Sequence, residues 1–342
     1  MKMKKNPEIT VLMSVYNGEK YLHEAINSIL NQTFEDYEFL IINDGSNDNT
    51  EEILQSYDDQ RIRIVNNGKN IGLTKSLNKG LKIARGQYVA RMDADDVSYP
   101  ERLEMQYKHV NNDKNLAICA SYHEEIDETG NLIETIKPNL EPEQLYYFLT
   151  FSNRFLHSSV LMRKDIISKV GGYDESIKRT QDYDLWYRVS RVAKINVIDK
   201  VLVKHRVHKE SISLTYRDSQ RHFASLIAFK NIEGIYKKCN WQVDPRILKM
   251  LSGEGDKETS FKGIDPNSFI NSLIVLHNYL LEAAPEYINK KKLEKIYWRR
   301  IYNCIALALK KEKYSSIKNI LCQNFMNKGF VTSYIKNSLS MS

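Results

Sequence analysis

The sequence lacks any apolar run that approaches the roughly 18 residues a membrane-spanning helix needs. It also lacks paired cysteines, because Cys119, Cys239, Cys304 and Cys322 lie far apart without disulfide or metal-binding spacing. The first residues, Met1 to Asn6, are basic but contain no signal-peptide core. These absences argue against an integral membrane protein and a disulfide-rich secreted scaffold, and we expect reduced thiols in a cytoplasmic protein.

Internal repeats and sizeable low-complexity tracts are absent as well. What is present is a composition of 42% hydrophobic and 27% charged residues, which is typical of a globular protein. The length of 342 residues exceeds what one hydrophobic core usually supports. We therefore expect one large domain and a smaller one.

Positive charge is concentrated towards the end of the chain. The net charge is +7, yet the residues from Glu286 onwards contain 12 Lys and Arg against 3 Asp and Glu, whereas the rest contain 38 against 40. Within Ile288–Leu309 the basic residues are mixed with apolar ones, which suits a helix with a basic side. We expect that side to meet an anionic lipid surface rather than nucleic acid. A solvated face, a helix packed on the first domain and a dimer contact are the alternatives.

The first hundred residues alternate between strand-like and helix-like segments. The predicted strands are Ile9–Val15, Phe39–Ile42, Ile62–Val65 and Tyr88–Met92, and the helices follow around Leu22–Leu30, at Thr50–Tyr57 and at Leu73–Ala84. Such alternation predicts an α/β fold, with a mainly parallel sheet covered by helices on both faces. Ligands of these sheets bind beyond the carboxyl ends of the strands.

Three polar clusters follow predicted strands, at Ser14–Gly18, Asn43–Ser46 and Asp93–Asp96. Carboxylates at the end of a buried strand are costly unless a positive charge offsets them. A divalent cation that carries a phosphate is the natural candidate, because Mg²⁺ and Mn²⁺ take oxygen ligands from carboxylates, phosphates and water. Each cluster alone is also compatible with an ordinary turn or helix cap.

The alternation becomes less regular after Asp96. The predicted elements are a helix at Pro100–Val110, a strand at Leu116–Ala120, a hairpin turn at Asp127–Asn131, a strand at Leu156–Met162, a helix to Val170, a loop at Gly171–Asp174, a helix from Asp182, and short strands at Ile195–Val197 and Val201–His205. From about Thr215 onwards we expect helices, with a polar break at Gly253–Pro266.

The chain resembles the family 2 glycosyltransferases, which have the GT-A fold, over residues 8 to 213. The matching motifs occur in the family's order and spacing: Val15 to Asn17, Asn43 to Asp48, Asn70 to Leu73, Asn78 to Gly80, Ala90 to Asp96, Gly171 to Asp174, Asp182 to Trp186, and Arg206 to His208. The resemblance implies a GT-A catalytic domain at residues 1–213, with a nucleotide-binding half at 1–98 and an acceptor-binding half at 99–213. Residues 214–342 would form a helical region that associates with a membrane or a second copy.

The resemblance also implies a nucleotide-sugar donor, with a UDP-sugar expected. Asp44 can accept the imide N–H of a uracil, and Tyr16 offers a ring on which a base can pack. The other residues expected to bind the donor are Ser14, Val15, Asn17, Lys69, Asn70, Asn78, Arg91, Asp93, Ala94 and Asp95. For Arg91 a surface ion pair is the alternative.

The family pattern places a Mn²⁺ or Mg²⁺ ion at the acidic cluster. Asp95 would bind the metal directly, and Asp93 would reach the ribose or a metal-bound water. By analogy with GT-A enzymes, His208 would complete the metal site, with His205 as the alternative; imidazole is a reasonable ligand for Mn²⁺.

The expected general base is Asp182, which would remove the proton of an attacking sugar hydroxyl. The alternative is a helix cap. In the family a Glu precedes this Asp, whereas this chain has Gln181, which retains hydrogen bonding but removes a charge. The acceptor is expected near His157, Ser158, Gln181 and Trp186, although Trp186 also suits the core.

Together these features predict an inverting, metal-dependent enzyme that moves a hexose or N-acetylhexosamine from a UDP-sugar to a saccharide or lipid-linked saccharide. We expect it to act in surface polysaccharide synthesis, such as that of lipopolysaccharide or capsule, in the cytoplasm or on the cytoplasmic face of the inner membrane. The alternatives are a catalytically silent sugar-nucleotide binder, suggested by Gln181, and a nucleotidyltransferase. The latter usually has a Gly-rich basic loop after the first strand, where this chain has Tyr16 to Glu19.

Overall fold

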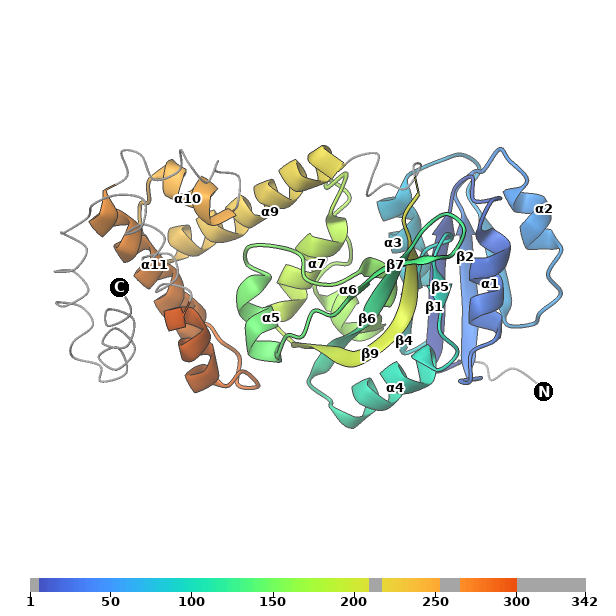
Figure 1. Cartoon of the computed structure of the whole chain (residues 1–342), viewed down its shortest axis with the longest axis horizontal. Helices are drawn as coiled ribbons and strands as arrows, with labels where there is room; N and C mark the ends of the chain where they lie inside the picture. Colours follow the sequence, from blue (N-terminus) through green and yellow to red (C-terminus); the bar gives the residue numbers. More distant parts are fainter. Residues whose placement is uncertain (1–5, 209–216, 253–264, 300–342) are drawn as a thin grey trace. The chain divides into compact units, whose positions relative to one another are not determined.

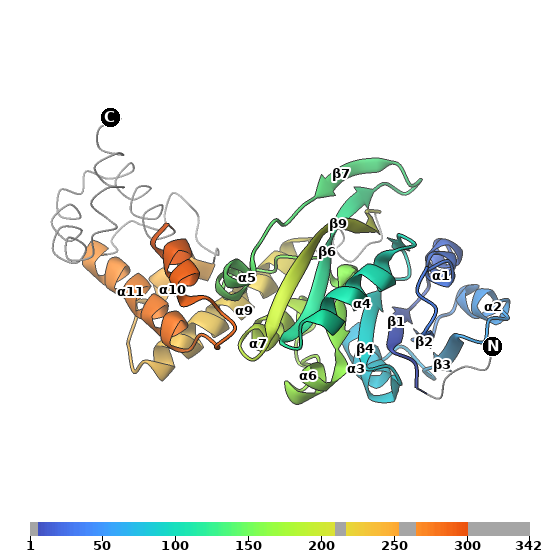
Figure 2. The same ribbon diagram turned by 90° about the horizontal axis from the view of Figure 1, so that it is seen from below.

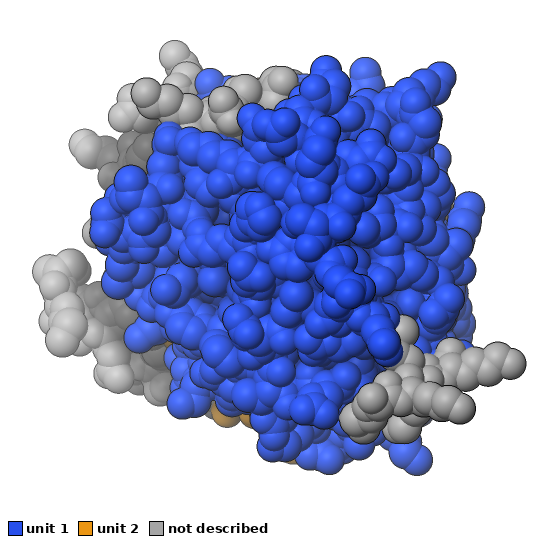
Figure 3. Space-filling model, turned by 90° about the vertical axis from the view of Figure 1, so that its right-hand side faces the viewer, with its two compact units in different colours: residues 1–228, 285–288 blue, residues 229–284, 289–342 orange. Residues whose placement is uncertain are grey.

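The computed structural model describes residues 6–208, 217–252 and 265–299 (Figure 1). The chain divides into two compact units (Figure 3). The first comprises the described residues up to Ala228 together with Pro285–Ile288, and the second comprises those of Phe229–Ala284 and from Asn289 onwards. The chain therefore leaves the first unit and returns to it for four residues.

A nine-stranded sheet forms the centre of the first unit. Its strands follow the order β3 (Ile62–Asn66), β2 (Tyr37–Asn43), β1 (Ile9–Val15), β4 (Tyr88–Met92), β8 (Leu161–Arg163), β6 (Leu116–Ile126), β9 (Lys194–Arg206) and β5 (Val97–Ser98), with β7 (Leu132–Ile136) paired to β6. The first four strands are parallel, as predicted, and β9 is parallel to β6. The short β8 joins the two parallel parts by antiparallel pairing on both sides.

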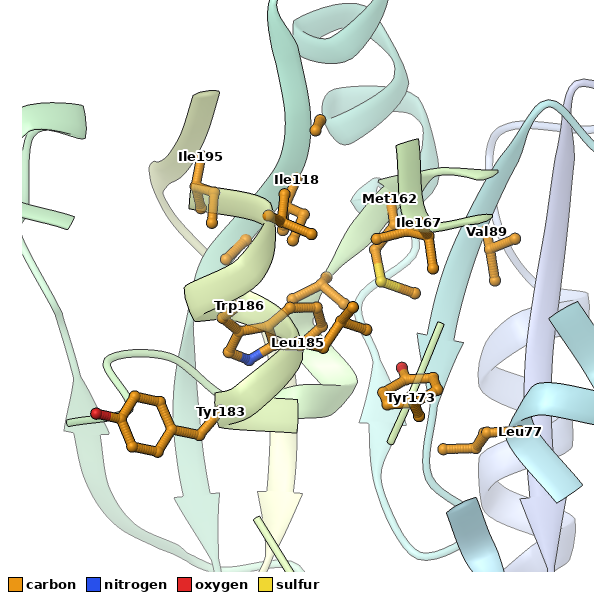
Figure 4. Close-up of a cluster of buried hydrophobic side chains, with 14 of the residues drawn as sticks. Leu77, Val89, Ile118, Met162, Ile167, Tyr173, Tyr183, Leu185, Trp186 and Ile195 are labelled. Carbon is orange, nitrogen blue, oxygen red and sulfur yellow. The ribbon is translucent and has the colours of Figure 1, made fainter. Parts of the chain in front are cut away.

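Strand β1 shows why the sheet is covered on both faces. Its residues Ile9, Val11, Met13 and Val15 lie in one buried hydrophobic cluster, and Leu12 lies in the other. This follows from the two-residue period of a strand. The first cluster takes its helical side chains from α1 (Leu22–Leu30), α2 (Thr50–Gln55) and α4 (Arg102–Asn112). The second takes them from α3 (Leu73–Ile83), α5 (Pro142–Phe148), α6 (Lys164–Lys169), α7 (Gln181–Ser190) and α9 (Arg217–Lys238) (Figures 1 and 4).

The strand predicted at Leu156–Met162 is wrong in its first half, where residues His157–Ser159 form a 3₁₀ turn, η1. The Ser159 hydroxyl donates to the Leu156 carbonyl at 2.8 Å, and the Ser158 hydroxyl donates to Asp96. Serine side chains that bond locally compete with strand pairing, which explains the turn. The strand begins only at Leu161.

The two short strands predicted at Ile195–Val197 and Val201–His205 are one continuous strand, β9. The exposed pair Asp199 and Lys200 resembles a turn in the sequence. The strand instead continues through it, and the register with β6 shifts around Tyr122. A bulge of this kind lets a strand absorb an extra residue without ending.

Two elements were not anticipated, β5 and α5. Helix α5 begins with a capping box between Glu141 and Gln144, with Pro142 in its first turn. This is a recognised helix start signal that the sequence does contain. The predicted hairpin is confirmed, because β6 and β7 are joined by the turn at Asp127–Asn131 (Figure 2).

The described part of the C-terminal region is helical, with α9 (Arg217–Lys238), α10 (Pro245–Ser252), α11 (Pro266–Glu282) and a helix at 290–299. None of the helices in the described residues is both long and apolar enough to cross a membrane. Most of the predicted break at Gly253–Pro266, the end of the basic helix beyond residue 299, and Cys304 and Cys322 lie outside the described residues.

Candidate active site

The loops that follow β1, β2 and β4 meet at one edge of the sheet. Strand β1 is parallel to both neighbours, with Val15 opposite Asn43 and Met13 opposite Met92. The three strands therefore end side by side, and their polar clusters share the carboxyl edge, as the alternating pattern predicts.

The first two of these loops are joined by hydrogen bonds. The backbone N–H of Asn17 donates to the Ser46 hydroxyl at 3.0 Å, and the Asn47 backbone N–H donates to the Asn17 side-chain oxygen at 2.9 Å. Asn17 has a positive φ of 53°, which this residue type tolerates better than most. The side chain of Tyr16 is 48% exposed, so its ring is accessible to a base. Ser14 and Val15 are buried beneath the loop.

Asp44 is buried and holds the loop that precedes α3. It accepts hydrogen bonds from the side chain of Asn67 at 2.7 Å and from the backbone N–H groups of Ile71 at 3.0 Å and Gly72 at 2.9 Å. These donors occupy three of the roughly four acceptor positions of a carboxylate, and Asp44 is only 2% exposed. Asn67 in turn bonds to Ser76 and Lys79 at 2.9 and 2.6 Å. This polar network was not identified in the sequence, because its members depend on how the loop folds.

Gly45 explains how the loop that precedes α3 passes so close to the end of β2. It has a φ of +72°, and a Cβ placed on it would lie 2.6 Å from the backbone carbon of Lys69. The side chains of Lys69 and Asn70 themselves are exposed at this edge. The close approach therefore presents both residues beside the Asp44 carboxylate.

Arg91 is fully buried rather than on the surface, and it forms an ion pair with Asp93. It also donates to the Met92 carbonyl. A second buried guanidinium, that of Arg102, donates to the carbonyl of Arg91 at 2.7 Å, and burial lowers its pKa to about 9. Asp93 keeps about a third of its side chain exposed, so its carboxylate still faces outwards.

The structure brings Asp95 and His208 together across 113 positions of sequence. The His208 Nε2 atom lies 2.9 Å from the Asp95 Oδ2 atom, and the Asp95 side chain is 33% exposed. Among the described residues, no three His, Cys, Asp or Glu side chains form a metal-binding group. A carboxylate–imidazole pair with solvent access nevertheless fits a cation whose remaining ligands are phosphate oxygens and water. Ala94, between the two acids, is half-buried.

Arg206 connects the end of β9 to the acidic loop. Its backbone N–H donates to Asp96 at 3.0 Å, its guanidinium donates to the carbonyl of Asp95 at 3.1 Å, and it pairs with Glu24 on α1. Asp96 is fully buried and also accepts from the Ser158 hydroxyl. Burial raises the pKa of Asp96 to about 7, and the charges of Asp95 and Asp93 add to the rise. Ser158 therefore supports the acidic loop from the interior.

Asp182 is the second residue of α7, and Thr180 occupies the cap position with a φ of 58°. Its carboxylate accepts a hydrogen bond from the side chain of Asn153 at 2.8 Å. Burial raises the pKa of Asp182, hydrogen bonds from the Tyr183 backbone and Asn153 oppose the rise, and the charge of Asp93 adds to it.

His157 and Tyr173 form a hydrogen-bonded pair, with His157 Nε2 2.7 Å from the Tyr173 hydroxyl oxygen. Burial lowers the pKa of His157 to about 3, with Arg91 contributing, so the imidazole is neutral at pH 7. Asn78 bonds to both the backbone N–H and the carbonyl of Tyr173, at 3.0 and 2.9 Å. Asn78 therefore holds the Gly171–Asp174 loop onto α3, and its amide is engaged there.

The remaining residues expected on the acceptor side are buried. Trp186 is fully buried in the larger hydrophobic cluster, beside Phe155 and His157, which is the core alternative (Figure 4). Gln181 is 7% exposed at the start of α7. Asn153, Tyr173 and Arg206 were not identified as site residues in the sequence. Tyr173 and Arg206 lie in motifs that match the family, which was the available signal, whereas Asn153 lies in none of them.

The sheet order and the polar carboxyl edge define a GT-A fold. S. aureus TarS 1–349 superposes with a TM-score of 0.54 at 19% identity, covering 82% of this chain and 81% of that one, and it has also been solved with UDP-GlcNAc. A mannosyltransferase from Pyrobaculum calidifontis, in complex with GDP-Man and Mn²⁺, gives 0.52 at 15% identity, covering 95% and 89%.

Sequence relatives narrow the class. Residues 10–171 match the family described as Glycosyl transferase family 2. An uncharacterized glycosyltransferase of Methanocaldococcus jannaschii is 38% identical over 209 residues, covering 59% of this chain and 71% of that protein. One from Haemophilus influenzae is 31% identical over 261 residues, covering 73% and 80%. The chain spans only 34% of a longer Rickettsia conorii relative. This chain belongs to glycosyltransferase family 2, and it is a glycosyltransferase.

Proposed function

We propose that this enzyme transfers a hexose or N-acetylhexosamine, with inversion, from a UDP-sugar to a hydroxyl of a saccharide or lipid-linked saccharide. The observation that carries the proposal is that two acids are held by side-chain partners, Asp95 beside His208 at 2.9 Å and Asp182 beside Asn153 at 2.8 Å. One acid is thus available to take a proton while the other end of the site holds the leaving group.

The donor base would pack on the exposed ring of Tyr16 and donate its ring N–H to the remaining acceptor position of Asp44. Uracil and guanine both carry such an N–H. The TarS complex with UDP-GlcNAc supports a uridine donor, whereas the mannosyltransferase complex contains GDP-Man. A thermal-shift comparison of UDP- and GDP-sugars would decide between them, because a ligand stabilises the native state that binds it.

The donor diphosphate would lie against Asp95 and His208, which would hold Mn²⁺ or Mg²⁺ between them. A bound divalent cation neutralises the negative charge that develops on a leaving diphosphate. Asp93, which is paired with Arg91, would orient the ribose or a water on the same side.

Asp182 would accept the proton of the acceptor hydroxyl as its oxygen bonds to the anomeric carbon and the bond from that carbon to the diphosphate breaks. A base on the face opposite the leaving group gives inversion, so an α-linked donor yields a β-linked product. Asp182→Asn should lower kcat by about 10²- to 10⁴-fold and leave UDP affinity unchanged, measured by transfer or donor hydrolysis and by calorimetry. Full activity in this variant would disprove the base assignment.

Gln181 motivates a second candidate, a silent sugar-nucleotide binder. It is buried directly before Asp182, where the family has a Glu. The two candidates differ in one measurement, since a silent binder takes up UDP-sugar but hydrolyses none with Mn²⁺ present. We favour the enzyme because Asp93, Asp95 and Asp182 are all present.

For the cellular setting, we propose a peripheral enzyme of surface polysaccharide synthesis on the cytoplasmic face of the inner membrane. The support comes from the helix at 290–299, where Lys290, Lys291 and Lys292 are exposed. Its Leu293 and Tyr297 are buried, so the basic side is the one left to meet an anionic surface. A homodimer contact through the same unit is the competing proposal.

A further inference from the structure

Asn153 is the side chain that bonds directly to the proposed base. It lies between α5 and η1, is half-buried, and belongs to none of the family motifs. Its side-chain oxygen accepts the backbone N–H of Arg154 at 2.8 Å. Because only the oxygen of an amide can accept, this bond fixes the direction of the amide. The nitrogen is thereby aimed at Asp182 Oδ2, 2.8 Å away.

The other donors to the Asp182 carboxylate are backbone N–H groups at the first turn of α7, those of residues 182 and 183. Asn153 is the only one of these three donors that a side-chain substitution can remove.

The charged and titratable groups around Asp182 act in opposite directions. Burial and the charge of Asp93 at the end of β4 disfavour the carboxylate, whereas the donors favour it. Tyr173 and His157 are the neighbouring titratable groups, and both are uncharged at pH 7, since burial raises the pKa of Tyr173 and lowers that of His157 to about 3. Arg91 is paired with Asp93. Asn153 thus donates a side-chain hydrogen bond directly to the charged base.

We propose that Asn153 is a positioning residue for Asp182, whose amide orients the carboxylate and favours its ionised form, so that the base can accept a proton from the acceptor at neutral pH. This inference rests on the proposed function of Asp182. It adds a residue outside the family motifs to the catalytic arrangement.

Asn153→Leu, which keeps the volume but has no donor, tests the proposal through the pH dependence of kcat. Loss of one hydrogen bond to a charged group should move the acidic limb of the pH profile to higher pH by about one unit. At pH values below that limb, kcat should therefore be about tenfold lower than in the wild type. Activity should return to near the wild-type value at high pH, with the KM of the UDP-sugar unchanged. Asn153→Asp should shift the limb further, because it adds a negative charge beside Asp182. The matched control is Asn139→Leu at an exposed asparagine.

Titration of Asp182 can be followed by ¹³C NMR on carboxyl-labelled protein, with the signal assigned by comparison with Asp182→Asn. Together with the activity of Asp182→Asn, it tests the role of Asn153 separately from the assignment of Asp182 as the base. An unmoved limb and an unmoved Asp182 titration in both Asn153 variants would overturn the role of Asn153 alone. A loss of kcat that is equal at every pH would do the same, because it would indicate a merely structural contact. Full activity of Asp182→Asn would overturn the proposed base and this inference together. If Asn153→Leu does not fold, Asn153→Asp carries the test.

Discussion

At the scale of single residues, the site contains a histidine that folding keeps neutral. The pKa of His157 is about 3, against about 6.5 in an unfolded chain. Between these values the unfolded chain binds a proton that the folded chain does not, so His157 contributes stability above pH 6.5 and loses it as the pH falls towards 3.

This behaviour predicts a stability difference that depends on pH. The gap in free energy of unfolding between wild type and His157→Gln should narrow by about 2 kcal/mol between pH 7 and pH 5, measured by urea denaturation. The comparison uses His109→Gln, at an exposed histidine, as its control. A constant gap would mean that His157 has the same pKa in the folded and the unfolded protein.

The Asp95–His208 pair predicts the metal dependence of donor binding. His208→Ala should weaken Mn²⁺-dependent UDP binding at least tenfold, roughly the smallest loss observed when even an outer-shell partner of a metal ligand is removed. Calorimetry with and without a chelator would measure it. Binding that is insensitive to both the chelator and the substitution would exclude this pair as the metal site.

At the scale of elements, the loop after β2 depends on a glycine. Gly45→Ala would introduce a Cβ 2.6 Å from the Lys69 backbone at a φ of +72°. The left-handed conformation alone costs about 1–2 kcal/mol, and the Lys69–Asn70 segment must also move. We expect weaker UDP binding and a lower melting temperature. Gly68→Ala, where an added Cβ meets nothing within 4 Å, is the control and should behave like wild type. Equal effects in both variants would contradict this account.

The elements also show which parts of the fold were predictable. The strands β1, β2 and β4 are continuous buried runs that end in turn residues, so their order and the shared edge at Asp44 and Asp95 could be inferred. The segment around His157–Ser159 is flanked by apolar residues, so it also suggested a strand. The Ser159 hydroxyl instead bonds to the Leu156 carbonyl and the Ser158 hydroxyl bonds to Asp96, and the contact with Asp96 exists only in the folded chain.

The candidate site divides in the same way. The pairing of Asp95 with His208 was expected from the family resemblance, because 113 positions separate the residues and no periodicity relates them. Asn153 and Tyr173 were missed because their roles come from hydrogen bonds to Asp182 and His157 on other elements. Trp186 was ambiguous since an apolar helix position suits both core and ligand, and its burial assigns it to the core.

At the scale of the whole molecule, the proposed contact of the basic helix with an anionic membrane surface can be tested directly. Replacing Lys290–Lys292 by Gln should lower the affinity for anionic vesicles, measured by co-sedimentation. At about 1 kcal/mol of binding free energy per lysine, the loss is about 3 kcal/mol, or somewhat over a hundredfold. Raised salt should have a similar effect. The control neutralises Lys82, Lys137 and Lys200, which are exposed on the first unit. No vesicle binding by the wild type would favour the dimer proposal instead.

The first unit is built from two separate stretches of the chain. Ile227 and Ala228 lie in its larger hydrophobic cluster, and the four residues from Pro285 rejoin it, with the Tyr287 hydroxyl 3.4 Å from the carbonyl of Ser190. During synthesis the ribosome must therefore add more than fifty further residues after Ala228 before the catalytic unit has all of its parts. The nascent chain would complete the first unit only after Phe229–Ala284 of the second unit have already emerged.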